Sequence, residues 1–172
     1  MRSNQLITGV LATVATSSLI GMGGAAQAGE PTTTNEKGIV LECSGTWRGE
    51  SVYASLYENN LYGNVIQIVV GDGEGAGGSR ETAKPFVEGR QVRGALRLDG
   101  SRARVEGTAR AVGRRTTVHE EHDDAGQHIT IDGTHRRVAS DLAFTWKGKT
   151  VPLDCADSFV YNLQVTKEST VD

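Results

Sequence analysis

The 172-residue chain lacks several features that would reveal its function directly. It has no nucleophile elbow, and its Ser, His and Asp residues are too numerous for a catalytic triad to be singled out. After the N-terminus, no segment approaches the roughly eighteen apolar residues that a membrane-spanning helix needs. The formal net charge of −3 is too small to make the whole molecule a partner for a polyanion. We therefore expect no membrane span and no cofactor, and an enzymatic activity has no support.

The N-terminus has the three parts of a secretory signal. Arg2 is followed by an apolar stretch from Leu6 to Met22, and the small residues Ala26-Gln27-Ala28 form a cleavage site. Residues 1–28 are therefore predicted to be a signal peptide, and the mature protein to be secreted. Residues 29–36 are polar and have no apolar period, so we expect a disordered leader there. A single domain is predicted over 37–167, with a flexible tail at 168–172.

No window of this domain has a sustained helical period, whereas short alternating runs bounded by Gly, Asn and Asp recur. The predicted class is all-β. Besides the two strands that flank residues 99–100, strands are expected at 39–48, 52–58, 62–70, 116–122, 128–134, 138–146, 151–153 and 159–167. Sequential strands with short connections predict an antiparallel meander.

The clearest unit is a hairpin around Asp99-Gly100, a dipeptide that suits a type I′ turn. This turn places Leu98 opposite Ser101 and Leu96 opposite Ala103. The inner face is then small and apolar. The other face is charged and carries Arg93, Arg97, Arg102, Arg104, Glu106 and Arg110.

The two cysteines, Cys43 and Cys155, lie near the two ends of the domain, and an exported protein permits their oxidation. We predict a disulfide bond between them. Such a bond brings the first strand beside the chain that precedes the last strand. This neighbourhood favours closure of the meander into a small β-barrel of eight to ten strands, with a β-sandwich as the alternative.

Residues Ser44-Gly45-Thr46-Trp47, next to Cys43, resemble the Gly-x-Trp signature that opens the barrel in the lipocalin and avidin-like group. The resemblance implies that the Trp closes one end of an eight-stranded barrel whose other end admits a small ligand. It thus implies a binding protein, with Trp47 as a candidate ligand-binding residue. The alternative is that Trp47 is a core aromatic of a β-strand.

Three of the four histidines lie in or just after the segment Val118-His119-Glu120-Glu121-His122-Asp123-Asp124, the third being His128. A turn at Ala125-Gly126 sets His122 opposite Ile129, Glu120 opposite Ile131 and Asp123 opposite His128. Because Val118, Ile129 and Ile131 should point inward, Glu120 and His122 are expected to line a polar end of the barrel cavity and to hold a ligand. The alternatives are a structural ion pair, a position at the exposed mouth, a weak Zn or Cu site on the other face, and a solvated hairpin.

Eight arginines stand between Arg90 and Arg115, against only Asp99 and Glu106. Arg93, Arg97, Arg102 and Arg104 could bind a polyanion such as teichoic acid, a heparin-like glycan or nucleic acid. The segment has no interleaved aromatic residues, which argues against nucleic acid. The alternative is a solvated face neutralised by neighbouring acidic strands.

The sequence thus favours a secreted, non-enzymatic binding protein, with a small molecule in the barrel or a macromolecule on its surface. One alternative is an inhibitor or interaction protein for a secreted enzyme, acting through the loops at 71–82 or 123–127. The other is a hydrolase or isomerase built around Glu120 and His122.

Overall fold

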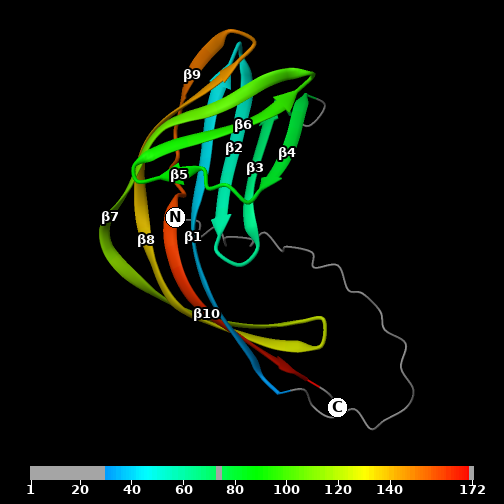
Figure 1. Ribbon diagram of the computed structural model, residues 1–172, viewed down its shortest axis with the longest axis vertical. Helices are drawn as coiled ribbons and strands as arrows, with labels where there is room; N and C mark the ends of the chain where they lie inside the picture. Colours follow the sequence, from blue (N-terminus) through cyan, green and yellow to red (C-terminus); the bar gives the residue numbers. More distant parts are fainter. Residues whose placement is uncertain (1–29, 73–74, 171–172) are drawn as a thin grey trace, which may run out of the picture.

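The computed structural model describes residues 30–72 and 75–170, and every regular element in them is a β-strand (Figure 1). The strands are β1 (Thr32–Trp47), β2 (Glu50–Asn59), β3 (Gly63–Val70), β4 (Ala76–Thr82), β5 (Val87–Glu88), β6 (Gln91–Leu98), β7 (Ser101–Asp124), β8 (Gln127–Trp146), β9 (Lys149–Leu153) and β10 (Phe159–Ser169). Within these ranges there is no helix long and apolar enough to cross a membrane.

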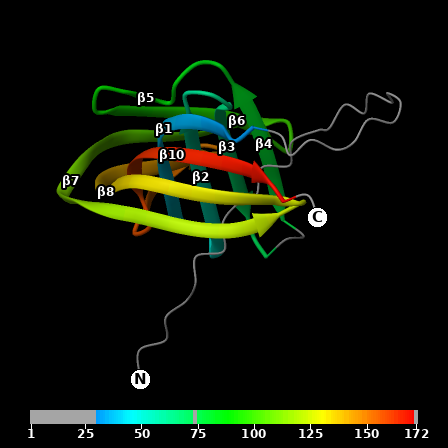
Figure 2. The same ribbon diagram turned by 90° about the horizontal axis from the view of Figure 1, so that it is seen from below.

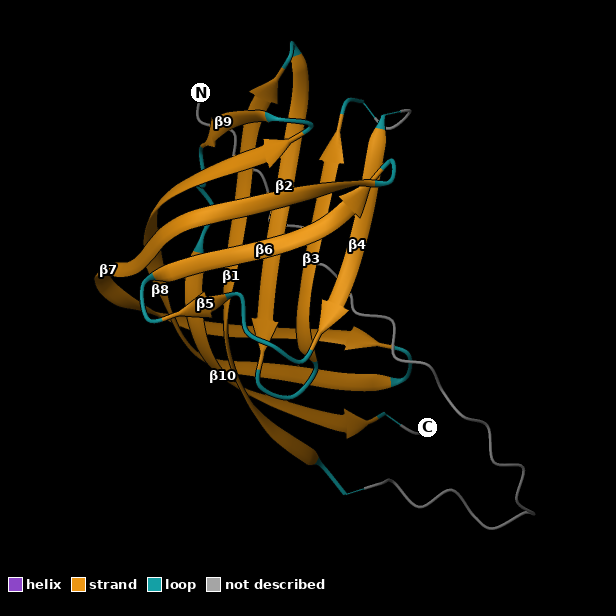
Figure 3. Cartoon of the chain, turned by 45° about the horizontal axis from the view of Figure 1, so that its top comes forward, coloured by secondary structure: helices purple, strands orange, loops and turns teal. Residues whose placement is uncertain are grey.

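All ten strands belong to one antiparallel sheet in the order β4-β3-β2-β1-β10-β8-β7-β6-β5, with β9 paired to β8. The predicted all-β antiparallel meander is confirmed. The described strands depart from a simple meander in two places: β10 lies between β1 and β8, and β4 and β5 are at opposite ends of the strand order. The sheet coils so that β6 crosses β3 and β4 (Figure 3), but no hydrogen-bonded ladder joins β4 to β6 in the described chain.

The part that we call the body, residues 39–111 and 138–158 where described, folds over a single hydrophobic core. Inward positions alternate with outward ones along each strand, as expected for a sheet with one buried face. The most completely buried side chains include Leu41, Val52, Leu56, Ile66, Ile68, Val92, Leu98, Val105, Leu142 and Phe144.

The part that we call the extension comprises residues 32–38, 115–137 and 159–169. It is a four-stranded sheet that runs away from the body as the lower ends of β7, β8, β10 and β1 (Figures 1 and 2). No second layer of described strands packs on it. Apart from Val160, which packs against the core of the body, its large aliphatic side chains lie on one face and are Val118, Ile129, Ile131, Leu163 and Val165.

The predicted disulfide is present and ties the first strand to the segment before the last one. Cys43 is buried on β1, and its Cα lies 4.0 Å from that of Cys155. Beside the bond, Ser44 and Asp154 exchange two backbone hydrogen bonds of 2.7 and 2.8 Å. The segment between β9 and β10 is therefore fixed against β1.

A buried polar cluster joins the body to the extension around Asn59. Its Nδ2 donates to the hydroxyls of Tyr57 and Tyr161 and to Glu36 Oε2, at 2.7, 3.0 and 2.9 Å. Burial is the main cause that raises the pKa of Tyr161, whose hydroxyl donates to the Glu58 carbonyl. A side chain on Gly38 would collide with that same carbonyl, so glycine is required here.

Several boundaries differ from the sequence-based expectations. β1 begins at Thr32, so residues 32–36 of the expected leader form an edge strand paired with β10. Residues 76–82 form β4 rather than a loop, and residues 73–74 lie outside the described chain. The segments expected as separate strands are continuous in β7 and in β8, and β10 extends to Ser169. The predicted signal peptide at 1–28 also lies outside the described residues.

Candidate functional site

Trp47 is buried at one end of the body, where its ring lies 4.6 Å from that of Trp146. Its indole N–H donates to the Trp146 carbonyl at 3.3 Å. The guanidinium of Arg48 covers Trp47, and the ammonium of Lys147 covers Trp146, at 4.6 and 4.1 Å from the ring centroids. The side chain has little surface left for a ligand, and its predicted binding role stays a prediction.

Glu120 and His122 lie opposite Ile131 and Ile129, in the register that the turn at Ala125-Gly126 predicts. Both side chains are exposed on the extension rather than turned into a barrel interior. The expectation placed them inside because it treated their hairpin as part of the barrel. In the structure, the apolar face of this hairpin continues the outer face of the body. On β1, Ile39 and Leu41 point to the core, whereas Thr34 and Glu36 lie on the opposite face, which is the face that carries the apolar side chains of the extension.

The opposite face of the same hairpin holds two exposed histidine–carboxylate pairs. His119 Nδ1 lies 2.7 Å from Asp132 Oδ1, and His128 Nδ1 lies 2.9 Å from Asp123 Oδ1. These hydrogen bonds are the largest cause that raises the pKa of each imidazole. Among the described residues, no group of three or more potential ligands converges as a metal site.

The four predicted polyanion-binding arginines share the outer face of β6 and β7. The register is the predicted one, with Leu98 opposite Ser101 and Leu96 opposite Ala103, so that the intervening residues point outward. All four side chains are exposed, and they are Arg93, Arg97, Arg102 and Arg104. We call this surface, together with Arg90 just before β6 and with Arg110 and Arg114 farther along β7, the arginine face.

Acidic side chains neutralise little of the arginine face. Arg104 has one long ion pair with Glu106, 3.9 Å, and both side chains are nearly half exposed. Arg97 stands directly opposite Arg102 in the β6–β7 ladder. Like charges directly opposite each other are destabilising, and a bound anion would relieve that repulsion.

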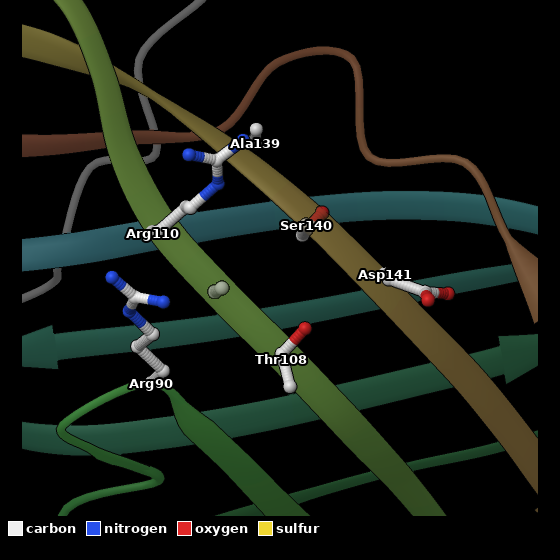
Figure 4. A pocket seen from close by; sticks show the side chains of 7 residues that line it. Arg90, Thr108, Arg110, Ala139, Ser140 and Asp141 are labelled. Carbon is white, nitrogen blue, oxygen red and sulfur yellow. The ribbon is translucent and has the colours of Figure 1, made fainter.

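The arginine face is hollowed where β6 begins. Figure 4 shows Arg90 and Arg110 flanking an open depression of about 360 Å³, with Thr108, Ser140 and Asp141 farther along it. The depression lies between the guanidinium group of Arg90, in the turn before β6, and that of Arg110 on β7. It is large enough for part of an elongated ligand rather than for a buried small molecule.

A second depression, of about 420 Å³, lies where β7 bends between the body and the extension. The bend is a β-bulge: the four residue steps from Ala111 to Arg115 on β7 lie opposite only two steps, from Val138 to Arg136, on β8. Gly113 takes a φ of +73° at this bulge, which glycine adopts at little cost. The lining includes Arg114, Thr116, His135, Arg137, Asp157 and Phe159.

No family model matches the chain, and the comparisons with curated proteins and with solved structures found no similar protein. The fold is compatible with the lipocalin and avidin-like group only as an all-β antiparallel sheet. The site must therefore be interpreted from its own chemistry.

Two features were not predicted from the sequence. The first is a repeat, Thr46-Trp47-Arg48-Gly49 and Thr145-Trp146-Lys147-Gly148, whose two turns have a positive φ at both central positions. This repeat was legible in the sequence and predicts a pair of equivalent hairpins. The second is the depression at the bend of β7, for which no local signal exists because its lining comes from three separate segments.

Proposed function

We propose that this protein is a secreted, non-enzymatic binding protein that holds a polyanionic macromolecule along its arginine face. The proposal rests on the row of exposed arginines on the outer face of β6 and β7, two of which lie directly opposite each other in the ladder. Nine regular residue steps separate Arg102 from Ala111 on β7, so the face extends over about 30 Å at roughly 3.3 Å per residue before it reaches the bulge that carries Arg114. An elongated anion is the ligand that this length and charge favour.

The packing of the body favours the surface over the interior as the binding site. Inward side chains from both sides of the folded sheet belong to one core cluster, and Leu41, Ile66 and Phe144 in it have no exposed surface. The two depressions described above are both open to solvent and lie on the outer surface. A small apolar molecule in a barrel interior therefore receives less support than a macromolecule on the outside.

The predicted signal peptide and the Cys43–Cys155 bond support the extracellular part of the proposal. A disulfide between distant parts of the chain is typical of an oxidising compartment. An extracellular protein meets polyanions such as acidic glycans and teichoic acids, which a surface of fixed arginine charges can bind.

The proposal is tested by the salt dependence of binding to an immobilised polyanion such as heparin. If five arginines each neutralise one anionic group, affinity should fall on the order of several hundred-fold between about 50 and about 200 mM salt, by analogy with phosphate contacts. The double variant Arg97→Glu and Arg104→Glu should elute at much lower salt than the wild type.

The matched control is the double variant Lys84→Glu and Arg115→Glu. It makes the same change in net charge with exposed residues that lie off the arginine face. If both double variants shift the elution equally, binding reflects only net charge. An elution that is indifferent to salt and to Arg97→Glu and Arg104→Glu would rule the proposal out.

A further inference from the structure

The depression at the bend of β7 continues the arginine face but differs from it in chemistry. Arg110 and Arg114 follow Arg102 and Arg104 on the outside of β7, and Arg114 forms part of the lining. Here the charges stand beside an aromatic ring, a carboxylate and hydroxyl groups. A surface that attracts anions only by charge would not need these additional groups.

The walls of the depression are held in place by specific contacts. Arg136 Nε donates to the Gly113 carbonyl at 3.0 Å, which fixes the bulge. On the other side, Ser158 O accepts from Val138 N at 2.8 Å and Ser158 Oγ accepts from Glu42 N at 3.2 Å. Cys155, in the same connection between β9 and β10, is bonded to Cys43. Preformed walls of this kind reduce the entropy lost when a ligand binds.

The cationic groups of the depression have no anionic partner in the described chain. No carboxylate lies within ion-pair distance of Arg114 or Arg137, whereas five such pairs occur elsewhere in the described residues. Guanidinium groups bind a carboxylate or phosphate through two parallel hydrogen bonds. The lining thus provides a place for one anionic group.

The remaining lining residues select the rest of the ligand. The ring of Phe159 lies 5.8 Å from that of His135, centroid to centroid, and Phe159 is only partly buried. An aromatic face of this kind packs against an apolar ring surface. The Asp157 carboxylate and the Thr116 hydroxyl can accept hydrogen bonds from hydroxyl groups, and Asp157 repels a ligand that carries only negative charge.

We propose that this depression binds one acidic sugar residue of the polyanion. Arg114 and Arg137 bind its carboxylate, Phe159 packs against its ring, and Asp157 and Thr116 accept hydrogen bonds from its hydroxyls. The inference rests on the proposed function and deepens it, because it makes the polyanion an acidic glycan. A volume of about 420 Å³ is near the lower end of the range of small-molecule pockets and suits one or two sugar rings.

The test uses three probes on the full mature protein at a salt concentration high enough to screen the arginine face. They are a uronate tetrasaccharide, the same tetrasaccharide with its carboxyls reduced to alcohols, and an inorganic polyphosphate of matched charge. Titration calorimetry should give tightest binding for the uronate. Arg114→Gln and Arg137→Gln should each weaken it roughly tenfold, the loss expected for a charge-assisted bidentate contact.

Arg115→Gln is the matched control, because Arg115 neighbours Arg114 in sequence but points to the opposite face of the sheet. It should change uronate affinity by less than about twofold, within the small effect of a distant exposed charge. Equal losses for Arg114→Gln and Arg115→Gln, or equal binding of the uronate and its reduced form, would overturn the inference. So would tighter binding of polyphosphate with the same dependence on Arg114.

A second measurement uses the wild type alone, so its result does not depend on whether a variant folds. Addition of glucuronate to the wild type should shift the NMR signals of the His135 imidazole and the Gly113 amide, while those of His119 stay unchanged. Glucuronate that leaves His135 and Gly113 unmoved would contradict the pocket. If the pocket fails while Arg97→Glu and Arg104→Glu still lower the salt concentration at which the protein elutes from heparin, the proposed function stands without this subsite.

Discussion

The body and the extension share β1, β7 and β8, yet they bury their apolar side chains on opposite faces of these strands. In the body, Leu41, Val105 and Leu142 point into a core enclosed by the folded sheet. In the extension, Val118, Ile131 and Val165 lie on the face that is outside in the body. The alternation keeps its phase along each strand, because the four steps of the β7 bulge oppose two steps on β8. The change therefore reflects which face each half of the strand covers with apolar residues.

The difference shows that a strand can serve two structural roles along its length. The first half of β7, in the body, contributes side chains to the core. Its second half, in the extension, carries charged residues at the free edge of a four-stranded sheet. Charged residues on an exposed edge prevent pairing with other chains. The bend at Gly113 separates the two halves and forms the depression at their junction.

Among the variants that test this comparison, removal of the disulfide should have the largest effect on the free energy of unfolding. The bond closes a loop with a sequence separation of 112 residues, and the chain-entropy model assigns it about 5 kcal/mol of stability. We expect the double variant Cys43→Ser and Cys155→Ser to lower the free energy of unfolding by up to that amount in urea denaturation. A loss below about 1 kcal/mol would mean that the body is held together without this link.

Truncation of a leucine in each region should separate the two kinds of packing. Leu142→Ala removes a side chain that is 2% exposed from the core of the body, and should lower the free energy of unfolding by about 3 kcal/mol. Leu163→Ala acts on a partly buried side chain of the extension and should cost about 1 kcal/mol, because less apolar surface is lost. Equal losses would indicate that the extension is packed as tightly as the body.

The smallest expected effect on stability comes from removing a carboxylate that is hydrogen-bonded to a histidine of the extension. Because the hydrogen bond to Asp132 raises the pKa of His119 above its ordinary value of 6.5, Asp132→Asn should return it toward that value in an NMR titration. The stabilisation is fully present below the pKa of the unfolded state and is lost as the pH rises through that of the folded state. The wild type and Asp132→Asn should therefore differ in stability near about pH 5.5 and converge at alkaline pH. An unchanged titration of His119 in Asp132→Asn would contradict the assignment.

Local turn chemistry explains why part of the arrangement could be predicted. Asp99-Gly100 and Ala125-Gly126 both form two-residue turns with positive φ at both positions, and each fixes the register of its hairpin. The exposed positions of Arg93, Arg97, Arg102 and Arg104 follow from that register. The insertion of β10 between β1 and β8 could not be predicted in this way, because it depends on contacts between residues far apart in the chain.

The sequence by itself determined the class, the hairpin registers, the disulfide and the charged outer face of β6 and β7. These features depend on side-chain alternation, on turn residues, and on the presence of two cysteines in a chain predicted to be exported. Only the tertiary structure decided that Glu120 and His122 stand outside the body, and that Arg114, Arg137, Asp157 and Phe159 line one depression. The physical reason is that the coiling of the sheet and the bend of β7 are set by long-range packing, which decides what each strand face meets.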